Sequence, residues 1–424
     1  MSTSFDEARR LILQQAPTLG VERVMLLNAP GRILAEEVVA PCDLPPYDVS
    51  AMDGYAVHAA GCEAGTTLKV TGFIPAGGRP SPVVTAGCAV KIMTGAPVPA
   101  GCDAVVPVEE TEEQADAVRL LAAITPGQHL RRRGEDVARG DLVIPAGSLI
   151  RPPEISMLAS LGWLTVPVFR RARVAIVSTG DELVEPGAAL EPGQIVNSNA
   201  FSLAAAVQEC GGEPVLLGIA RDEWESHEQL FAAGLQCDAL ITSAGVSTGD
   251  RDLVREVLEA LGVKQLFWKI AIKPGGPTAF GVKGQVPVFS LPGNPVSTMV
   301  TFEELVRPAL LRMMGHRRVI RPLLKGILQE DLRKGGDKTH FLRVQVRVEQ
   351  GRYLVSTAGD QRTGTLRTMV QASALALIPQ EATFLPAGSE VDFHLLSDDV
   401  LMLDPQSAPE SAHPPSHAKA NACR

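Results

Sequence analysis

Acidic side chains in short loops rich in glycine, serine and threonine are the first candidates for chemistry in this sequence. Asp53 lies in PPYDVSAMDGYAV, where two prolines stiffen the entry and a DG pair makes a turn. Glu182 lies in STGDEL, Asp238 begins DALITS, and Asp252 follows SAGVSTGD. Carboxylates of this kind can hold Mg²⁺ beside a phosphate or orient an attacking oxygen. A solvated acid in an ordinary turn is the alternative that local sequence leaves open.

Some loops also offer backbone N–H groups and hydroxyls to an anion. These loops are STGDEL at residues 178–183, SAGVSTGD at 243–250 and SLPGNPVS at 290–297. Their candidate ligand-binding residues are Ser243, Gly245, Ser247, Pro292, Asn294 and Pro295. The second loop lacks the GxxxxGK[ST] spacing of a P-loop, and the third leads into a predicted helix, whose N-terminus favours an anion. Plain turn chemistry explains any one loop alone.

Cationic side chains complete the candidate set. Lys269 and Lys273 lie four residues apart in the otherwise apolar FWKIAIKPGGP, and lysine seldom points into a core. Anion binding and simple snorkelling at a sheet edge explain them equally well. Arg131 lies beside Asp136 in RRRGEDVARGD, which suits an oxyanion or a solvated charged turn. Thr94 of IMTGAPVPAGCD is a turn hydroxyl or a ligand-facing donor.

The elements that must position these loops are clearest in residues 172–316. Predicted strands and helices alternate there, with strands in 172–179, 213–220 and 238–245 and at the end of 278–293, and helices in 197–212, 223–236, 250–262 and 294–315. Such alternation predicts a parallel sheet with helices on both faces, a doubly wound α/β domain. Ligands of such sheets bind beyond the carboxyl ends of the strands, where the loops following the strands meet. We therefore expect all three loops at one rim.

The remaining chain is predicted to be rich in β-structure. A strand pair is expected in residues 21–40, turned at NAPGR, and residues 152–161 open with prolines and predict a helix. The predicted domains are a discontinuous N-terminal domain of 1–57 with 146–171, a β-rich insertion of 58–145, the α/β domain of 172–318, a small C-terminal β-barrel of 319–404 and a disordered tail of 405–424. His413 and His417 in the tail are solvated or bind a metal weakly.

Composition excludes several classes of protein. The 424 residues suggest two to four domains, and no apolar run of about 18 residues predicts a membrane span. The N-terminus does not have the pattern of a signal peptide, so a cytoplasmic location is expected. Seven scattered cysteines without a CxxC pair argue against a disulfide framework or a structural zinc site. A net charge of −9 with 4% aromatic residues argues against a nucleic-acid binder.

Seven motifs together resemble the MoeA family of molybdenum-cofactor synthesis, to which the E-domain of gephyrin is similar. The motifs are SAMDGYAV, IMTGAPVP, RRRGED, STGDEL, GQIVNSN, AIKPG and LPGNPVS, in family order, and the resemblance runs to about residue 404. It implies a four-domain homodimer that inserts molybdate into the dithiolene of adenylylated molybdopterin, with Mg²⁺ present and AMP released. The active cleft would lie between the α/β domain of one subunit and the first two domains of the other.

The resemblance also implies roles for individual residues. The catalytic residues would be Asp53, Thr94, Arg131, Asp136, Glu182 and Asp252. The metal ligands would be Glu182, Asp238 and Asp252. Substrate binding would fall to Asp238, Ser243, Gly245, Ser247, Lys269, Lys273, Pro292, Asn294 and Pro295. The sequence departs from the family pattern at Val49, Ala244 and Gly276, where Asn, Gly and Lys are common. Ala244 restricts a loop that favours close backbone approach.

Two rival functions are considered. The first is the molybdopterin adenylyltransferase that acts one step earlier. It shares the α/β domain but is a smaller protein, so the β-rich insertion and the C-terminal domain argue against it. The second is a non-enzymatic scaffold like gephyrin, although no receptor-facing extension is evident in the sequence. Expected partners are a second copy of the chain, the adenylyltransferase and downstream cofactor-synthesis proteins, without nucleic acid or membrane.

Overall fold

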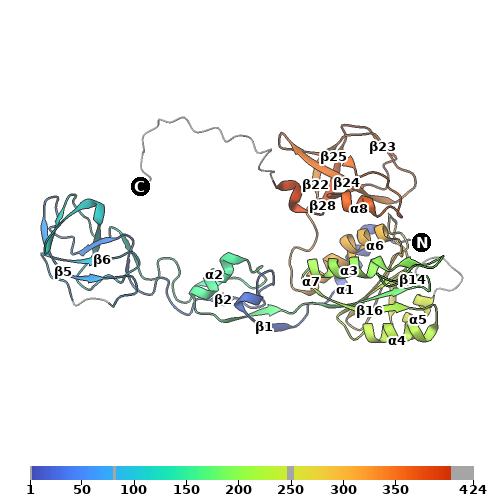
Figure 1. Cartoon of the computed structure of the whole chain (residues 1–424), viewed down its shortest axis with the longest axis horizontal. Helices are drawn as coiled ribbons and strands as arrows, with labels where there is room; N and C mark the ends of the chain where they lie inside the picture. Colours follow the sequence, from blue (N-terminus) through green and yellow to red (C-terminus); the bar gives the residue numbers. More distant parts are fainter. Residues whose placement is uncertain (1, 80–82, 246–252, 403–424) are drawn as a thin grey trace. The chain divides into compact units, whose positions relative to one another are not determined.

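The computed structural model describes residues 2–79, 83–245 and 253–402. The chain forms two compact units, of which one comprises residues 21–169 and the other the segments before and after it. Figure 1 shows the elements of both. Within the described ranges, no helix is long and apolar enough to cross a membrane.

A six-stranded sheet is the centre of the larger unit. Its strands, in spatial order, are β16 (Glu213–Ala220), β13 (Arg173–Thr179), β17 (Ala239–Ser243), β21 (Val286–Leu291), β20 (Ala279–Lys283) and β18 (Lys264–Phe267). The first four strands are parallel, but β20 and β18 are antiparallel to their neighbours. The sheet is therefore mixed, which corrects the prediction of a parallel sheet. The segment 278–293, predicted to end in a strand, ends in β21, and β20 before it completes a hairpin turned between Lys283 and Val286 with Gly284 at a φ of 60°.

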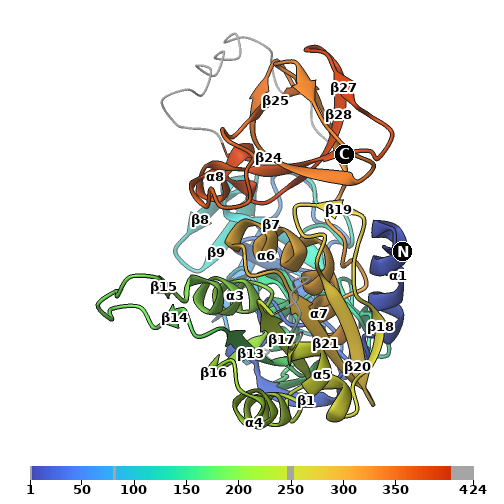
Figure 2. The ribbon, with the colours of Figure 1, turned by 90° about the vertical axis from the view of Figure 1, so that its right-hand side faces the viewer.

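Helices cover both faces of this sheet, as a doubly wound domain requires (Figure 2). Val174 and Ile176 of β13 join one core and the intervening Ala175 and Val177 join the other, because successive side chains of a strand point to opposite faces. The first core includes side chains of α1 (Phe5–Gln15), α3 (Ser198–Glu209), α6 (Pro295–Thr301), the π-helix η3 (Phe302–Val306) and α7 (Arg307–Met313). The second includes side chains of α4 (Trp224–Gly234) and α5 (Leu253–Ala260).

The first helix belongs to this α/β core. Phe5, Ala8 and Ile12 of α1 are buried in it, and the Phe5 ring meets the Phe341 ring edge-on at 5.0 Å between centroids. In the structure the first 20 residues thus pack with residues from 170 on, whereas residues 1–57 are predicted from the sequence to belong to one domain.

The C-terminal domain is a small barrel. It closes because the long strand β24 (Thr339–Glu349) pairs with strands on both sides. The other barrel strands are β25 (Arg352–Thr357), β22 (Leu324–Leu328), β28 (Glu390–Leu395) and β26 (Ala374–Ile378). A short strand of the α/β domain, β19 (Ile272–Lys273), adds to β24 in parallel and sets Lys273 opposite His340. Smaller elements of this unit are β14 (Leu183–Val184), β15 (Ile195–Val196), β23 (Leu332–Arg333), β27 (Phe384–Leu385), α8 (Arg367–Gln371) and η4 (Asp398–Leu401).

The other unit contains a second six-stranded sheet. Its spatial order is β7 (Ala104–Pro107), β4 (Gly54–Val57), β6 (Cys88–Ile92), β5 (Thr67–Ile74), β9 (Ala117–Leu120) and β8 (Thr111–Gln114). The remaining elements are β1 (Val21–Met25), η1 (Leu26–Asn28), β2 (Val38–Val39), β3 (Val49–Ser50), η2 (Val108–Glu110), β10 (Leu130–Arg131), β11 (Leu142–Ile144), α2 (Pro152–Ser160) and β12 (Thr165–Phe169). The helix predicted at 152–161 is confirmed. The strand pair predicted in 21–40 is wrong, because β1 pairs with β12 and β2 with β11.

Candidate functional site

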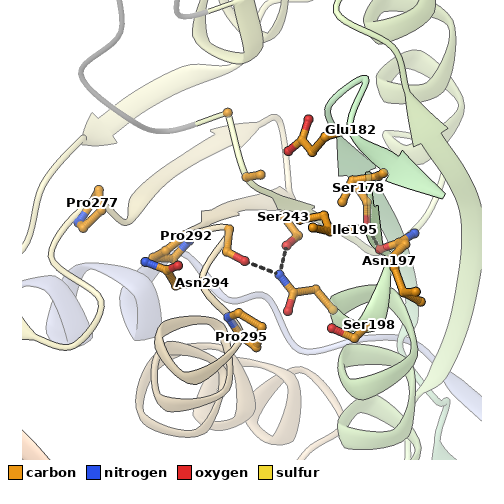
Figure 3. Close-up of a pocket in the computed structure, with 16 residues that line it drawn as sticks. Ser178, Glu182, Ile195, Asn197, Ser198, Ser243, Pro277, Pro292, Asn294 and Pro295 are labelled. Carbon is orange, nitrogen blue, oxygen red and sulfur yellow. Dashed lines mark hydrogen bonds between the residues drawn. The ribbon is translucent and has the colours of Figure 1, made fainter. Parts of the chain in front are cut away.

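A cavity of about 550 Å³ opens at the carboxyl ends of β13, β17 and β21 (Figure 3). We call it the rim cavity, and its lining residues are Ser178, Glu182, Leu183, Ile195, Val196, Asn197, Ser198, Asn199, Ser243, Ala244, Gly245, Pro277, Pro292, Gly293, Asn294 and Pro295. These residues come from all three predicted loops. The loops converge because β13, β17 and β21 are adjacent and parallel, so the segments that follow them emerge at the same edge.

Most of the predicted residues of these loops line the rim cavity, and the others lie outside the described residues. Ser243, Gly245, Pro292, Asn294 and Pro295 all line the rim cavity. Two further predicted residues, Ser247 and Asp252, lie outside the described residues.

An Asn-Ser-Asn segment at the start of α3, absent from the predicted site residues, ties the loops together. Asn197 accepts a hydrogen bond from Ser178 Oγ at 2.8 Å and another from the backbone N–H of Ala200. Asn199 Nδ2 donates to Ser243 Oγ at 2.9 Å and to the carbonyl of Gly293 at 2.8 Å. The sequence indicated helix caps here, but no local pattern tells which cap residue faces a distant loop.

Glu182 is the single carboxylate that lines the rim cavity in the described part of the chain, and no lysine, arginine or histidine of that part lines it. The side chain of Glu182 folds over Gly180, which has a φ of 135°. A Cβ at Gly180 would lie 2.4 Å from Glu182 Oε2, so glycine leaves room for the carboxylate. Glu182 can therefore reach a ligand in a cavity that is otherwise neutral.

Ala244 occupies a left-handed backbone position in the second loop. Its φ is 77°, a conformation that costs an alanine about 1–2 kcal/mol relative to glycine. Its amide donates to the carbonyl of Leu291, and a Cβ on Gly293 would lie 3.1 Å from the Ala244 Cβ. The backbones of the second and third loops approach closely here, as the departure from the family pattern led us to expect.

Asp238 lies at the amino-terminal ends of the parallel strands, opposite to the rim cavity. Its prediction as an acid of the rim and a metal ligand is therefore wrong. It precedes β17, a strand of five residues that spans roughly 17 Å, whereas Ser243 ends that strand at the cavity. Both carboxylate oxygens accept from the Arg170 guanidinium, and one also accepts from the Arg173 N–H. Burial alone would raise the pKa of Asp238, but these donors outweigh it and hold the pKa below its usual value.

The other predicted metal ligands form no cluster. Glu182 and Asp238 lie at opposite ends of the parallel strands, and Asp252 lies outside the described residues. Across the segments that the structure describes, no group of three or more His, Cys, Asp or Glu side chains is arranged to hold a metal.

A second cavity, of about 620 Å³, lies where β19 meets the barrel. We call it the basic cavity, and its lining residues are Lys273, Pro274, Leu332, Arg333, Lys334, Gly335, His340, Phe341, Leu342, Arg343, Asp360, Gln361, Arg362, Thr363 and Gly364. The predicted anion-binding Lys273 lies here and does not line the rim cavity. Lys269 is exposed and lines neither cavity.

The positive charge of the basic cavity is partly buried. Arg343 is 1% exposed and donates to Thr368 Oγ1 and to the carbonyls of Asp360 and Arg362, each at 3.1 Å. Lys334 donates to two carbonyls of the barrel at 2.8 Å. Burial first, and then the neighbouring lysines 334, 273 and 338, lower the pKa of His340 to about 4. The cavity therefore offers fixed cations and a histidine that is neutral near pH 7.

The two cavities are neighbours. Asn294, which lines the rim cavity, donates from Nδ2 to Oγ1 of Thr363, which lines the basic cavity, at 3.4 Å. β19 and the loop after it also contribute to both, because Lys273 and Pro274 line the basic cavity and Pro277 lines the rim cavity. Asn294 and Thr363 therefore form a boundary between the two cavities.

The remaining predicted residues lie in the unit of residues 21–169. Asp53 accepts from the Thr94 N–H at 2.7 Å and from Thr94 Oγ1 at 2.8 Å. These bonds, the backbone one first, hold the pKa of Asp53 below its usual value. Arg131 and Asp136 are both exposed, and Arg131 Nε lies 3.7 Å from Glu135 Oε1. Asp53 and Thr94 thus form one local pair on an accessible surface.

Comparison with known proteins follows this architecture along the chain. Residues 3–162 match the MoeA N-terminal region (domain I and II), residues 175–312 a probable molybdopterin binding domain, and residues 325–396 the MoeA C-terminal region (domain IV). A molybdopterin molybdenumtransferase of Haemophilus influenzae is 37% identical over 393 residues, covering 92% of this chain and 97% of that protein. Molybdopterin molybdenumtransferase 2 of Mycobacterium tuberculosis is 37% identical over 401 residues, covering 92% and 98%.

The solved structures agree. A molybdopterin biosynthesis MoeA protein from Pyrococcus horikoshii superposes with a TM-score of 0.82 at 32% identity, covering 94% of this chain and all of that one. Family matches, relatives and fold thus coincide over nearly the whole chain. The chain belongs to the MoeA family of molybdopterin molybdenumtransferases.

Proposed function

We propose that this chain inserts molybdate into the dithiolene of adenylylated molybdopterin, with AMP released, as a step of molybdenum-cofactor synthesis. The observation that carries the proposal is the adjacency of the two cavities at Asn294 and Thr363. The rim cavity, lined by hydroxyls and amides beside the one carboxylate of Glu182, suits a heterocycle, while a cationic cavity suits a tetrahedral oxyanion. The reaction needs both kinds of ligand side by side.

In this proposal the rim cavity takes the substrate. Ser243, Gly245 and Asn294 offer hydroxyl, backbone and amide groups to it, and Pro292 and Pro295 shape the third loop. The basic cavity takes molybdate, which Lys273 and the buried Arg343 attract. The exposed Lys269 is proposed to draw anions toward this side of the unit.

Mg²⁺ fits the rim cavity through Glu182. Magnesium commonly binds one or two carboxylates, keeps several waters and takes the remaining ligands from substrate phosphates. Glu182 supplies one carboxylate in an otherwise neutral cavity, so its charge is free for a cation. When bound, the ion would neutralise phosphate charge as the adenylate is cleaved. Asp252 stays a proposed second ligand, and Ser247 a proposed phosphate donor.

A second copy of the chain is proposed to complete the site. The pair Asp53 and Thr94, with Arg131 and Asp136, would supply acid and cation to a cleft formed with the α/β domain of the partner. An apolar surface supports dimerisation, because large hydrophobic side chains on β1, η1 and the residue before β12 are 52–88% exposed. These side chains are Val21, Met25, Leu27 and Leu164.

The proposal extends to the domain limits, the location and the partners. We propose the insertion at 58–145, the α/β domain at 172–318 and the barrel at 319–404. The described cysteines are free thiols, which fits a reducing, cytoplasmic compartment. A molybdopterin adenylyltransferase would supply the substrate, and downstream cofactor-synthesis proteins would take the product.

The decisive experiment supplies the purified protein with adenylylated molybdopterin, Mg²⁺ and molybdate and measures AMP release and protein-bound molybdenum. We expect one AMP for each molybdenum inserted. Formation of the adenylate from ATP and molybdopterin without added partner would favour the adenylyltransferase instead. Capture of a receptor by a protein inactive in both assays would favour a scaffold.

A further inference from the structure

The side chain of Asn199 connects two loops that the sequence separates by about 50 residues. Its Nδ2 donates to Ser243 at the end of β17 and to Gly293 after β21, as the dashed lines of Figure 3 mark. A carbonyl oxygen can only accept, so the bond to Gly293 fixes which end of the amide faces the loops. Both hydrogens of the amide nitrogen are thereby committed to holding the loops.

The helix does not need this side chain. Asn197 is the N-cap of α3 and accepts from the Ala200 N–H, whereas Asn199 is the second residue of the helix. Asparagine is a weak helix former at such a position. Asn199 Oδ1 is buried without a hydrogen-bond partner in the described chain, as is Asn197 Nδ2. A buried amide oxygen without a partner costs stability, and the two bonds that Asn199 donates run to the loops and not to its own helix.

We propose that Asn199 is a positioning residue for the reaction of the rim cavity. As a donor to two loops it sets the separation between Ser243 and Gly293, and with it the width of the cavity that receives the substrate. The inference rests on the proposed function of the rim cavity. It goes beyond that proposal because it gives a role to Asn199, which holds the loops in place and is not proposed to contact the reacting atoms.

Two substitutions distinguish the loss of the hydrogen bonds that Asn199 donates from a change in the size of its side chain. Asn199→Asp keeps the size of the side chain but places an oxygen against the Gly293 carbonyl, while Asn199→Ala removes the amide without adding charge. Ser202→Ala is the matched control, because Ser202 lies on the same helix and donates to the carbonyl of Asn199 away from the loops. We expect both Asn199 variants to bind AMP at least tenfold more weakly and to turn over at least tenfold more slowly at saturating substrate. Thermal unfolding should shift no more than in Ser202→Ala.

Hydrogen exchange supplies a measurement that does not depend on catalysis. Amides of residues 240–245 and 290–295 should exchange faster in both Asn199 variants, while those of residues 203–209 keep their protection. Unchanged exchange in these loops, or wild-type affinity and turnover in either variant, overturns the inference. If the wild type releases no AMP, the proposed function fails, but the exchange measurement still decides whether Asn199 holds the loops.

Discussion

The rim cavity and the basic cavity differ more in charge than in size. The rim cavity is formed by loops after parallel strands, and in the described chain its one charged side chain is Glu182. The basic cavity is formed by barrel strands and β19, and it collects lysines and arginines around one acid, Asp360, which pairs with Arg362. A carboxylate attracts a cation more strongly where no neighbouring cation neutralises it, and an oxyanion is attracted more strongly by cations that no acid neutralises. The α/β domain thus supplies the cavity with the carboxylate, and the neighbouring barrel supplies most of the cationic side chains of the other cavity.

The largest expected effect comes from loosening the barrel that carries the basic cavity. His394 of β28 and Glu304 of the π-helix form a buried pair, with Nδ1 2.9 Å from Oε1. His394→Ala leaves the Glu304 carboxylate buried without its partner, so the free energy of unfolding should fall by about 3 kcal/mol. Urea unfolding measures this. Glu304→Gln retains a polar contact and should cost less, and equal stability of His394→Ala and wild type would contradict the account.

Reversing the charge of Lys273 tests whether the cavities are chemically separate. Lys273→Glu should lower molybdenum insertion at least 100-fold, about 2.7 kcal/mol, while AMP affinity changes less than threefold. The matched control is Lys283→Glu, an exposed lysine in the hairpin between β20 and β21. Isothermal titration with AMP and a molybdenum assay supply both numbers. An equal loss of molybdenum insertion and of AMP affinity would mean that the two cavities are not chemically separate.

Replacing Asp53 tests whether the two cavities are sufficient for molybdenum insertion without this carboxylate. In Asp53→Asn the amide oxygen can still accept from Thr94, so the fold should persist while the negative charge is lost. We expect molybdenum insertion to fall about 100-fold, because such a group must be accurately placed. Circular dichroism checks the fold, and Thr94→Val removes only the hydroxyl donor. Turnover like that of wild type would remove Asp53 from the mechanism.

Neutralising Glu182 tests whether the rim cavity depends on its one carboxylate. Glu182→Gln removes the carboxylate from the rim cavity and should lower AMP release about tenfold and raise the Mg²⁺ concentration needed for half-maximal rate. A magnesium titration of the rate measures both effects. Sulfate binding to the basic cavity should not change, and an unaltered magnesium requirement would leave Glu182 without a metal-binding role.

The smallest expected effect is a pH dependence confined to the basic cavity. His340 has a pKa of about 4, below the usual 6.5, so it is neutral near pH 7. A bound sulfate offsets the neighbouring lysines and raises that pKa, so sulfate affinity should be flat above about pH 6.5 and rise a few-fold as pH falls toward 4. Because the folded pKa is depressed, His340 also withdraws stability as pH falls through the same range. His340→Gln should abolish the affinity change, and a persisting rise would assign it elsewhere.

Local sequence predicted the elements well where a signal repeats. The alternation of strands and helices gave the doubly wound domain, and the strand ends gave the three converging loops, because parallel neighbours expose their carboxyl ends at one edge. The same logic failed at Asp238, which precedes its strand and so lies at the opposite edge. It also missed β20, which pairs with β21 through a two-residue turn, because only the strand at the end of this segment was predicted.

Pairings between distant segments escaped prediction for a different reason. β1 pairs with β12 across more than a hundred residues, and nothing in the local pattern of residues 21–40 names that partner. Lys273 shows the same limit at the site. The family resemblance implied an anion-binding lysine, but the register of β19 against β24 sets it beside His340 in the basic cavity.

By itself the sequence determined the kinds of side chain available for anions, cations and turns, and the order of helices and strands, since these follow from residue type and periodicity. Tertiary structure alone decided which of those groups share a cavity. Strand direction and register fix the edge at which a side chain emerges, and they depend on contacts between residues far apart in the chain. Asn199 is the plainest case, because both of its partners are remote in sequence and only the folded sheet brings them within hydrogen-bonding distance.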